Sequence, residues 1–366
     1  MPAADFHLLE NEEDLARRLD DYVKAEVLAL DIETTGLDPH THRIRLVQIA
    51  AQGLPVLIVD LFKCRHGLSA LTPLLVNKSV KVIHNAKFEL KFLLQNGVEL
   101  KGQIFDSMLA DKLLHAGIRG HSSTLEHLAE RYLKQPLDKE KQTSDWSGAL
   151  TQGQLTYAAR DAEVLLPLRE QLVRSLVDQE LVEVAELEFD CVRTVAQMEL
   201  ASLGLDVRKW QEYCRLIEEK ITDYKGRLEQ HFQEWQAQQE KPLNLNSSQQ
   251  LQIALQQLGI KVNSTRKEVL EGHSHQPVVA DLLAYKEWRS QQSKYGHKIL
   301  QAVHPTTGRI HADYRQLGTE TGRFSCSQPP LQQIPKQPQV RQCFIAAQGQ
   351  RLVIADYSQI ELRGAR

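Results

Sequence analysis

The chain has 366 residues, of which 42% are hydrophobic and 25% are charged, and its formal net charge is −3. This length predicts about two domains of ordinary size, with enough apolar residues for packed cores. No apolar run is long enough to span a membrane, and the acidic start of the chain lacks the features of a secretory signal peptide. We therefore expect a cytoplasmic protein with no membrane partner.

The cysteine spacing and the charge distribution indicate which metals and partners to expect. The five cysteines are widely spaced and include no CxxC pair, so the sequence predicts reduced thiols and neither a disulfide framework nor a zinc site. From residue 285 to the end there are 12 Lys and Arg against 5 Asp and Glu, whereas the rest of the chain is strongly acidic. A basic C-terminal part could hold a phosphate backbone, and an acidic front part could hold cations.

The first part of the chain alternates short β-rich runs with helical patterns. Strands are predicted at 26–33, 43–51, 54–61 and 80–85, and helices at 68–76, 84–93, 106–116 and 123–133. The first of these strands begins near Glu26. Because short connections join the first three strands, we expect an α/β domain whose sheet is partly antiparallel.

Strand signals disappear after about Gln152, and long helical patterns continue to Leu300. A Gln-rich stretch is interrupted at Pro242 and by Asn and Ser residues, which predicts a helix, a turn and another helix. The final stretch is rich in Gly, Pro and Arg. It ends on the apolar run RLVIADY at 351–357, which has the pattern of a buried strand.

The first acidic motif lies in the predicted strand at 26–33. Alternation along a strand turns Asp31 and Glu33 to one face, while Leu30 and Ile32 take the other. Two carboxylates this close repel each other and favour a cation between them. Oxygen ligands without His or Cys favour Mg²⁺ or Mn²⁺ over zinc.

The second acidic motif is the stretch HNAKFEL, which begins at His84 and opens an amphipathic helix. Glu89 falls near the middle of the apolar face of that helix, where a lone carboxylate is costly unless it is paired, protonated or bound to metal. The alternative is that Asn85 caps the helix and that Glu89, partly exposed, favours the helix dipole from its first turn.

The third acidic motif is YAARDAE, which begins at Tyr157. Thr151 and Gln154 predict a capping box at the start of its helix, and Pro167 predicts a kink or an end soon after it. Tyr157 and Asp161 are four residues apart and so share one face. A phenol beside a metal-bound carboxylate can orient a water or accept its proton, although an ordinary Tyr and a solvated Asp fit the same spacing.

The three motifs DIETTGL, HNAKFEL and YAARDAE occur in this order, with KQTSDWSGAL before the last. In combination they resemble the DEDD-type 3′ to 5′ exonucleases of the tyrosine subclass, which have a ribonuclease H-like fold. That family normally has Asp at the second motif, where this chain has Glu89. The resemblance therefore implies that Glu89 is a functional acid, one methylene longer than the family's residue.

The same resemblance implies hydrolysis of phosphodiester bonds with two ions of Mg²⁺ or Mn²⁺. Asp31, Glu33 and Asp161 would hold the ion that generates the attacking hydroxide. Glu89, with Asp31, would serve the ion at the leaving 3′ oxygen. Tyr157 would position the water.

Sequence further along the chain resembles family A DNA polymerases, the DNA polymerase I type. The stretches TETGRFS at 319–325 and DYSQIELR at 356–363 are the most specific, and the resemblance extends from about residue 25 to the end. It implies that Asp356 binds the polymerase's metals, that Glu361 screens against a ribose 2′ hydroxyl and that Arg323 contacts the DNA backbone.

The resemblance divides the chain into three parts. These are an exonuclease domain at 1–178, a helical thumb-like region at 179–300 and an incomplete first palm segment at 301–366. Cys326 and Pro330 depart from the family's usual Ser and Asn. Since the chain stops at Arg366, after the first palm motif, we expect no polymerase activity from it alone.

The expected partner is DNA, as single-stranded 3′ ends or primer-template. Leu37 and Asn85, next to the first and second motifs, are expected to contact this nucleic acid together with Arg323. Two other hypotheses remain open from the residues. One is a non-editing DNA-binding half that needs a separately encoded C-terminal polymerase half, and the other is an RNA-trimming exonuclease resembling ribonuclease D.

Overall fold

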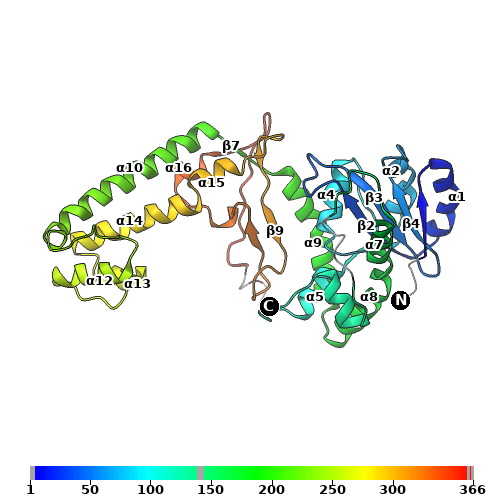
Figure 1. The fold of residues 1–366 in the computed structure, drawn as a ribbon, viewed down its shortest axis with the longest axis horizontal. Helices are drawn as coiled ribbons and strands as arrows, with labels where there is room; N and C mark the ends of the chain where they lie inside the picture. Colours follow the sequence, from blue (N-terminus) through cyan, green and yellow to red (C-terminus); the bar gives the residue numbers. More distant parts are fainter. Residues whose placement is uncertain (1–4, 138–143, 361–362, 364–366) are drawn as a thin grey trace. The chain divides into compact units, whose positions relative to one another are not determined.

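The computed structural model of the chain describes residues 5–137, 144–360 and 363, and it divides into two compact units (Figure 1). Unit 1 comprises Met1–Ser202 and His311–Gln328, and unit 2 comprises Leu203–Ile310 and Pro329–Arg366. Unit 1 has one hydrophobic core, whereas unit 2 has two. The functional boundaries at 178 and 300 stay a prediction.

A six-stranded mixed sheet forms the centre of unit 1, in the order β1-β4-β3-β2-β5-β6. The β2–β3 and β3–β4 pairs are antiparallel, and the pairs β1–β4, β2–β5 and β5–β6 are parallel. This confirms the predicted α/β fold with a partly antiparallel sheet. The strands are β1 (Phe6–Leu9), β2 (Val27–Thr34), β3 (Ile44–Ala50), β4 (Val56–Asp60), β5 (Val80–Ile83) and β6 (Ile104–Asp106).

The four predicted strands are confirmed, but two edge strands were not predicted. The expectation that the first strand begins near Glu26 is wrong, because β1 precedes it and pairs with β4. Both β1 and β6 are at most four residues long. Runs this short do not show enough alternation to be recognised as strands.

Helices flank the sheet of unit 1 (Figure 1). Helix α7 packs against β2, β3 and β4 and ends just before α8, which has Pro167 in its first turn. The helices are α1 (Glu12–Val23), α2 (Gly67–Ala70), α3 (Thr72–Leu75), α4 (Lys87–Gln95), α5 (Ser107–Leu114), α6 (Leu125–Leu128), the π-helix η1 (Ala129–Leu133), α7 (Gln152–Glu163), α8 (Leu165–Asp178) and α9 (Val182–Ala201).

A hairpin far along the chain also belongs to unit 1. Strands β9 (Asp313–Arg315) and β10 (Ser325–Ser327) pair antiparallel. The carboxylate of Glu199 on α9 accepts hydrogen bonds from Lys87 at 2.7 Å, from Lys91 at 2.8 Å and from the backbone N–H of Tyr314 at 2.7 Å. Lys87 also contacts Asp313 at 2.7 Å. Charge-assisted bonds therefore fasten the hairpin to α4 and α9.

Unit 2 is mainly helical, as predicted. Its long helices α10 (Val207–His231) and α14 (Pro277–Lys294) pack against each other. The short strands β7 (Leu203–Leu205), β8 (Arg309–Ile310) and β11 (Phe344–Ile345) form an antiparallel sheet that was not predicted. The remaining elements are α11 (Gln233–Gln236), α12 (Ser248–Gln257), α13 (Lys267–Glu271), α15 (Gly296–Gln301), the 3-10 helix η2 (Leu331–Gln333) and α16 (Pro338–Arg341).

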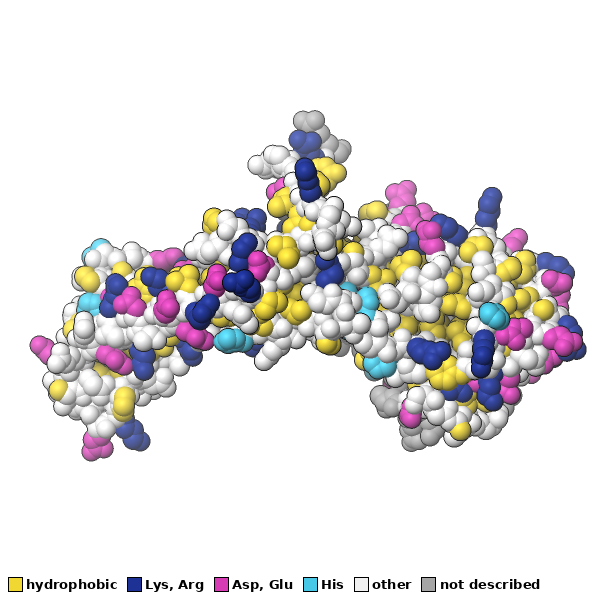
Figure 2. Space-filling model, turned by 90° about the horizontal axis from the view of Figure 1, so that it is seen from above, with side chains coloured by type: hydrophobic (Ala, Val, Ile, Leu, Met, Phe, Trp, Pro, Cys, Tyr) yellow, Lys and Arg dark blue, Asp and Glu magenta, His cyan; other side chains and the backbone are white. Residues whose placement is uncertain are grey.

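Charges of both signs alternate on the surface of the α10–α14 arm of unit 2. Figure 2 shows Lys and Arg side chains interspersed with Asp and Glu side chains on the face in view. On α10, Arg227 lies 2.9 Å from Asp223, and Lys225 lies 3.6 Å from Glu229. Such pairs four residues apart stabilise an exposed helix slightly.

The run at 351–357 departs from its prediction as a buried strand. Leu352, Val353 and Ile354 are 49%, 90% and 86% exposed, and the structure assigns no strand to them. An apolar pattern predicts burial only where another element packs against it, and none of the described residues does so here. The five cysteines form no disulfide with one another in the part of the chain that the structure describes. Among the described helices, none combines the length and apolar character needed to cross a membrane.

Candidate active site

The two acids of the first motif lie at the end of β2. Asp31 and Glu33 are half-buried, while Ile32 between them is buried, so the predicted alternation is confirmed. In the register of the antiparallel pair, Asp31 lies opposite Gln48 of β3 and Glu33 lies opposite Leu46. Side chains directly opposite each other share a face of the sheet. The two carboxylates therefore share a face with Gln48.

Glu89 on α4 is buried, with only 3% of its surface exposed. Burial raises the pKa of Glu89 well above its usual range, and the negative charges of Asp31, Asp106 and Glu33 raise it further. Glu89 therefore points inward toward the acids of the first motif, as its place on the apolar face predicted. The alternative of a partly exposed glutamate beside an Asn85 cap is wrong.

The turn before α4 is held by Asp106, a residue that the sequence reasoning missed. Asn85 has a left-handed backbone with φ 63, which Asn tolerates better than most residues. The buried Asp106 carboxylate accepts N–H bonds from Asn85 at 3.1 Å and from Ala86 at 2.8 Å. It also caps α5 by accepting from Met108 and Leu109. One carboxylate thus fixes the start of two helices, and its place between a strand and a helix was the available signal.

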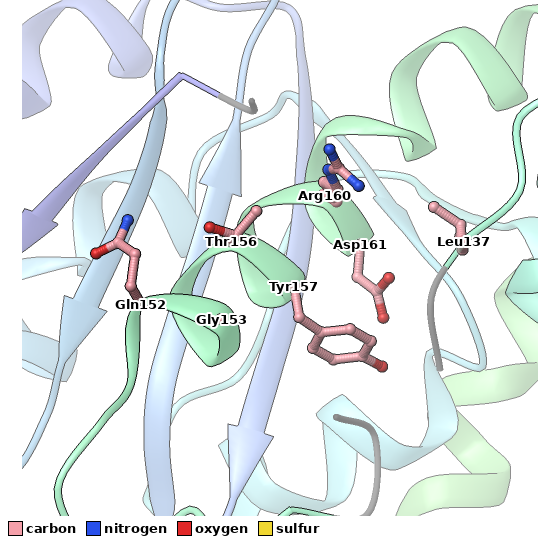
Figure 3. A pocket seen from close by; sticks show the side chains of 7 residues that line it. All are labelled: Leu137, Gln152, Gly153, Thr156, Tyr157, Arg160 and Asp161. Atoms are coloured by element: carbon pink, nitrogen blue, oxygen red, sulfur yellow. The ribbon is translucent and has the colours of Figure 1, made fainter. Parts of the chain in front are cut away.

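The third motif lies on α7, whose predicted capping box is present. The Thr151 hydroxyl accepts from the Gln154 N–H at 3.2 Å, and the Gln154 side chain accepts from the Thr151 N–H at 2.9 Å. Figure 3 shows the Tyr157 ring and the Asp161 carboxylate on the same side of α7. Burial raises the pKa of Tyr157 far above its usual value, and the charge of Asp161 and a hydrogen bond to it add to the rise.

The three motifs meet at one place. The charges of Asp31 and Glu33 act on Glu89 of α4 and on Tyr157 of α7, and Tyr157 is hydrogen-bonded to Asp161. Four carboxylates in a largely buried setting repel one another strongly. This arrangement therefore calls for positive charge, and its purely oxygen donors suit Mg²⁺ or Mn²⁺.

Two buried polar side chains at this place support the fit of cations. The Oε2 atom of Glu89 has no hydrogen-bond partner among the described residues. The same is true of both amide atoms of Gln48, which is fully buried opposite Asp31. Buried polar atoms normally have a partner. Ions with their bound waters would supply the missing partners, so the residues present fit the cofactor that the motifs predict.

A cavity of about 400 Å³ lies beside α4 and is lined by Leu37 and Asn85. Leu37 is 82% exposed, so it is not the ordinary core leucine that its residue type would suggest. Lys112 and Arg315 are among the other lining residues. The cavity therefore offers an apolar side chain and positive charge, which suit a base and a phosphate. Asp106 lines the same cavity.

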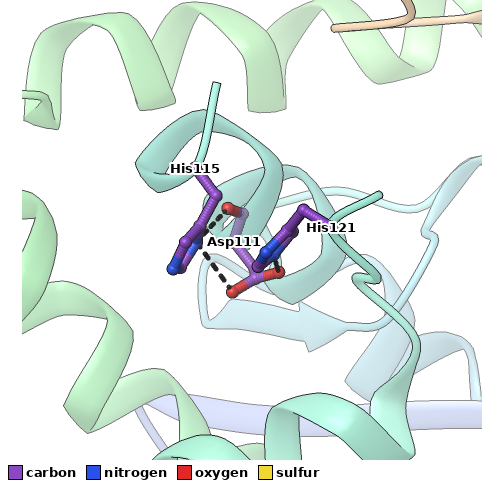
Figure 4. Close-up of side chains that lie close together, drawn as sticks. All are labelled: Asp111, His115 and His121. Carbon is purple, nitrogen blue, oxygen red and sulfur yellow. Dashed lines mark hydrogen bonds and ion pairs between the residues drawn. The ribbon is translucent and has the colours of Figure 1, made fainter. Parts of the chain in front are cut away.

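Asp111, His115 and His121 form another group of potential metal ligands (Figure 4). The Asp111 carboxylate lies 2.7 Å from Nε2 of His121 and 3.3 Å from Nδ1 of His115. However, Nη1 of Arg131 lies 2.8 Å from Asp111 and 3.2 Å from the same Nε2. The guanidinium already supplies the positive charge that a metal would bring. We therefore interpret this group as an ion-pair cluster around the buried Asp111.

The polymerase motif residues belong to other segments of the chain. Arg323 is exposed in the segment between β9 and β10 of unit 1. Asp356 is exposed and belongs to unit 2. Glu361, and the first three residues of KQTSDWSGAL, lie outside the described residues. The predicted roles of these residues stay predictions.

Comparisons with known proteins confirm the two family resemblances predicted from the sequence. A family profile described as 3′-5′ exonuclease matches residues 6–177. A second profile, described as DNA polymerase family A, matches residues 212–365. The two matched regions follow each other along the chain. Nothing in these comparisons supports the separately encoded polymerase half considered from the sequence.

Relatives of the chain align with most of its length. It is 32% identical to the DNA polymerase I of Chloroflexus aurantiacus, over 93% of this chain and 39% of the relative. It is 30% identical to the DNA polymerase I of Aquifex aeolicus, over 98% of this chain and 62% of the relative. Its fold resembles that of the POL domain of Pol1 from M. smegmatis, which was solved in complex with DNA primer-template and dNTP. The TM-score is 0.78 at 24% identity, and the match covers 98% of this chain and 62% of that chain. The chain thus spans less than two thirds of these proteins.

Proposed function

This chain belongs to family A of the DNA polymerases and contains a 3′–5′ exonuclease domain, and on this basis we propose that it removes nucleotides from DNA 3′ ends by metal-dependent hydrolysis. The observation that carries the proposal is the burial of Glu89 beside the acids of the first motif. A buried carboxylate among like charges is too costly for a purely structural role unless a cation or a proton compensates it.

The acids divide between two cations in this proposal. Asp31, Glu33 and Asp161 would hold one ion of Mg²⁺ or Mn²⁺, and Glu89 would hold the other together with Asp31. When bound, such ions supply a hydroxide near neutral pH and neutralise the charge that develops on the leaving 3′ oxygen. The longer side chain of Glu89 would reach its ion from α4 by one more methylene than an aspartate.

Tyr157 acts in this proposal as a hydrogen-bonding group. Its raised pKa keeps the phenol protonated at neutral pH, so it orients the attacking water instead of taking its proton. The hydrogen bond to Asp161 fixes the direction of the phenol. Both side chains come from one face of α7, which keeps their relative positions constant.

The substrate's end would occupy the cavity lined by Leu37 and Asn85. The exposed Leu37 side chain would pack against the terminal base, and Asn85 would bind the nucleotide from the turn before α4. Arg323, exposed on the hairpin, would contact the DNA backbone. We propose single-stranded 3′ ends and primer-template DNA as partners on this basis.

The experiment is the trimming of a 5′-labelled single-stranded DNA oligonucleotide with Mg²⁺ or Mn²⁺. We expect a ladder of shortened products, and a rate lower by about 10³-fold or more for Asp31→Ala and for Glu89→Ala, because each substitution removes a ligand that neutralises transition-state charge. Glu163→Ala is the matched control, since Glu163 is an exposed acid on α7. Its rate should equal that of the unaltered chain.

Three results would contradict parts of this proposal. A rate unaffected by Asp31→Ala would remove the acidic site from the reaction. No ladder from the unaltered chain, but one from Glu89→Asp, would mean that the longer side chain has abolished editing. Faster trimming of an RNA oligonucleotide of the same sequence would identify RNA as the substrate.

A further inference from the structure

Arg45 of β3 is a buried arginine in a fully satisfied ion pair. Its Nε and Nη2 atoms each lie 2.9 Å from a different carboxylate oxygen of Asp60 on β4. Both side chains are at least 94% buried, and the guanidinium lies over the ring of Phe62, 4.4 Å from the centroid. This two-point contact fixes the plane of the guanidinium. It therefore also fixes the direction in which the remaining nitrogen, Nη1, points.

The remaining nitrogen of Arg45 binds a loop distant in sequence. Its Nη1 atom donates to the carbonyl oxygen of Gly148 at 3.0 Å and to those of Trp146 and Ser147 at 3.4 Å each. Three successive carbonyl oxygens that point at one place would repel one another without a donor there. Arg45 therefore determines the course of the loop at 146–148.

That loop leads directly into α7 and contacts Tyr157. The carbonyl oxygen of Asp145 accepts from the side chain of Gln154, the capping-box residue of α7, at 3.1 Å. The buried Trp146 ring lies 6.3 Å from the Tyr157 ring, inclined by 38°. A contact of this kind constrains the orientation of both rings. Arg45 is thus connected to the phenol of Tyr157 through the backbone of the loop and the indole ring of Trp146.

We propose that Arg45, oriented by Asp60, is a positioning residue for Tyr157. The proposal rests on the proposed exonuclease function, in which Tyr157 orients the attacking water. Arg45 would not touch the substrate. It would hold the loop at 146–148 so that Trp146 confines the Tyr157 ring. Loss of this role should affect the chemical step and not substrate binding, because the cavity that would hold the DNA end is lined by other residues.

The test is a double-mutant cycle between Arg45→Met and Tyr157→Phe, measured as trimming of single-stranded DNA. We expect Arg45→Met alone to lower kcat about 10-fold or more with little change in KM, because small misplacements of a catalytic group are costly. In the Tyr157→Phe background, Arg45→Met should lower kcat less than 2-fold further. Additive losses would overturn the proposal, since a purely structural ion pair acts independently of Tyr157.

A control variant tests whether loss of any guanidinium that binds a backbone carbonyl has the same effect. Arg193 of α9 is half-buried and donates to the carbonyl oxygen of Gly102 at 2.5 Å, an acceptor outside the loop at 146–148. Arg193→Met should leave kcat unchanged, and a loss equal to that of Arg45→Met would contradict the proposal. If Arg45→Met fails to fold, Arg45→Lys takes its place in the cycle, because a lysine keeps the charge and loses the fixed donor plane.

A second readout is independent of activity. Acrylamide quenching of tryptophan fluorescence should increase in Arg45→Met, and the increase should vanish when Trp146→Phe is added to both chains. An unchanged quenching of Trp146 would overturn the proposal, because the loop would not depend on Arg45. If the unaltered chain trims no DNA, the proposed function fails and this proposal fails with it. If the unaltered chain trims DNA but the losses from Arg45→Met and Tyr157→Phe are additive, the proposal about Arg45 fails and the proposed function stands.

Discussion

At the scale of single residues, Lys81 of β5 is a buried charge with no acidic partner among the described residues. It is 1% exposed, and its Nζ atom donates to the Asn77 side chain at 2.7 Å and to the carbonyl oxygens of Asn77, Ser79 and Lys101 at 3.0–3.2 Å. Burial lowers the pKa of Lys81 to about 8, and the positive charge of Arg193 contributes. Neutral oxygens therefore compensate this charge incompletely.

The lowered pKa of Lys81 predicts a stability that rises with pH. Between pH 8 and 10.5 the unfolded chain binds a proton that the folded chain has lost, so the free energy of unfolding increases across this window. The contribution is on the order of 3 kcal/mol. Urea unfolding should show this rise in the unaltered chain and not in Lys81→Met. The exposed Lys78→Met is the control, and equal pH slopes for all three chains would contradict the prediction.

The burial of Glu89 could be predicted from the sequence, whereas the residues around it could not. Its burial could be predicted, because helical spacing alone places it among apolar neighbours. The role of Asp106 could not be predicted, because its four N–H bonds come from two turns that only the folded chain brings together. Gln48 was missed for a similar reason. Its position opposite Asp31 depends on the register of β2 and β3.

At the scale of elements, the start of α4 and the start of α5 depend on the same carboxylate. We expect Asp106→Ala to lower the free energy of unfolding of unit 1 by about 2–4 kcal/mol, because two buried and two half-buried N–H groups lose their acceptor. The control is Asn11→Ala, since Asn11 caps α1 through one bond to the N–H of Asp14. That substitution should cost about 1 kcal/mol.

Urea unfolding of the whole chain, monitored at several wavelengths, measures both variants. Equal losses for Asp106→Ala and Asn11→Ala would show that the bonds from Asn85 and Ala86 contribute nothing. In that case α4 would be held by packing alone. A larger loss for Asp106→Ala would instead mean that the turn before Glu89 depends on this residue.

The elements that carry a strong period or cap could be predicted. The central strands β2 to β5 are mainly apolar or β-branched, and α7 begins with a capping box that the sequence shows directly. The short strands β1, β6 and β7 could not be predicted, because each has at most four residues and depends on a neighbouring strand for its hydrogen bonds. Pairing with a neighbouring strand, and not the local sequence, determines the strand conformation of these three segments.

At the scale of the whole molecule, apolar side chains in unit 2 remain exposed. Val353 and Ile354 are 90% and 86% exposed, and Tyr357 is 75% exposed. Neighbouring exposed apolar residues favour association between molecules. We expect the double substitution Val353→Lys and Ile354→Lys to lower the associated fraction at high protein concentration. Light scattering after size exclusion measures this fraction.

The control for this prediction is Ile118→Lys, because Ile118 is an exposed apolar residue of unit 1 outside that run. A similar decrease for Ile118→Lys would show that added charge alone accounts for the effect. No decrease for the double substitution would show that the run at 351–357 does not mediate association. The trimming rate of each variant reports whether unit 1 is intact.

The hairpin at 313–327 also has a consequence for the order in which the protein is made. Its residues complete unit 1, yet they follow Ser202 by more than a hundred residues of other structure. A ribosome must therefore synthesise most of unit 2 before Tyr314 can reach Glu199. Until then the Glu199 carboxylate can bind Lys87 and Lys91 of α4 but not the hairpin. The nuclease part of a nascent chain therefore stays unfinished until the chain as far as Ser327 has emerged.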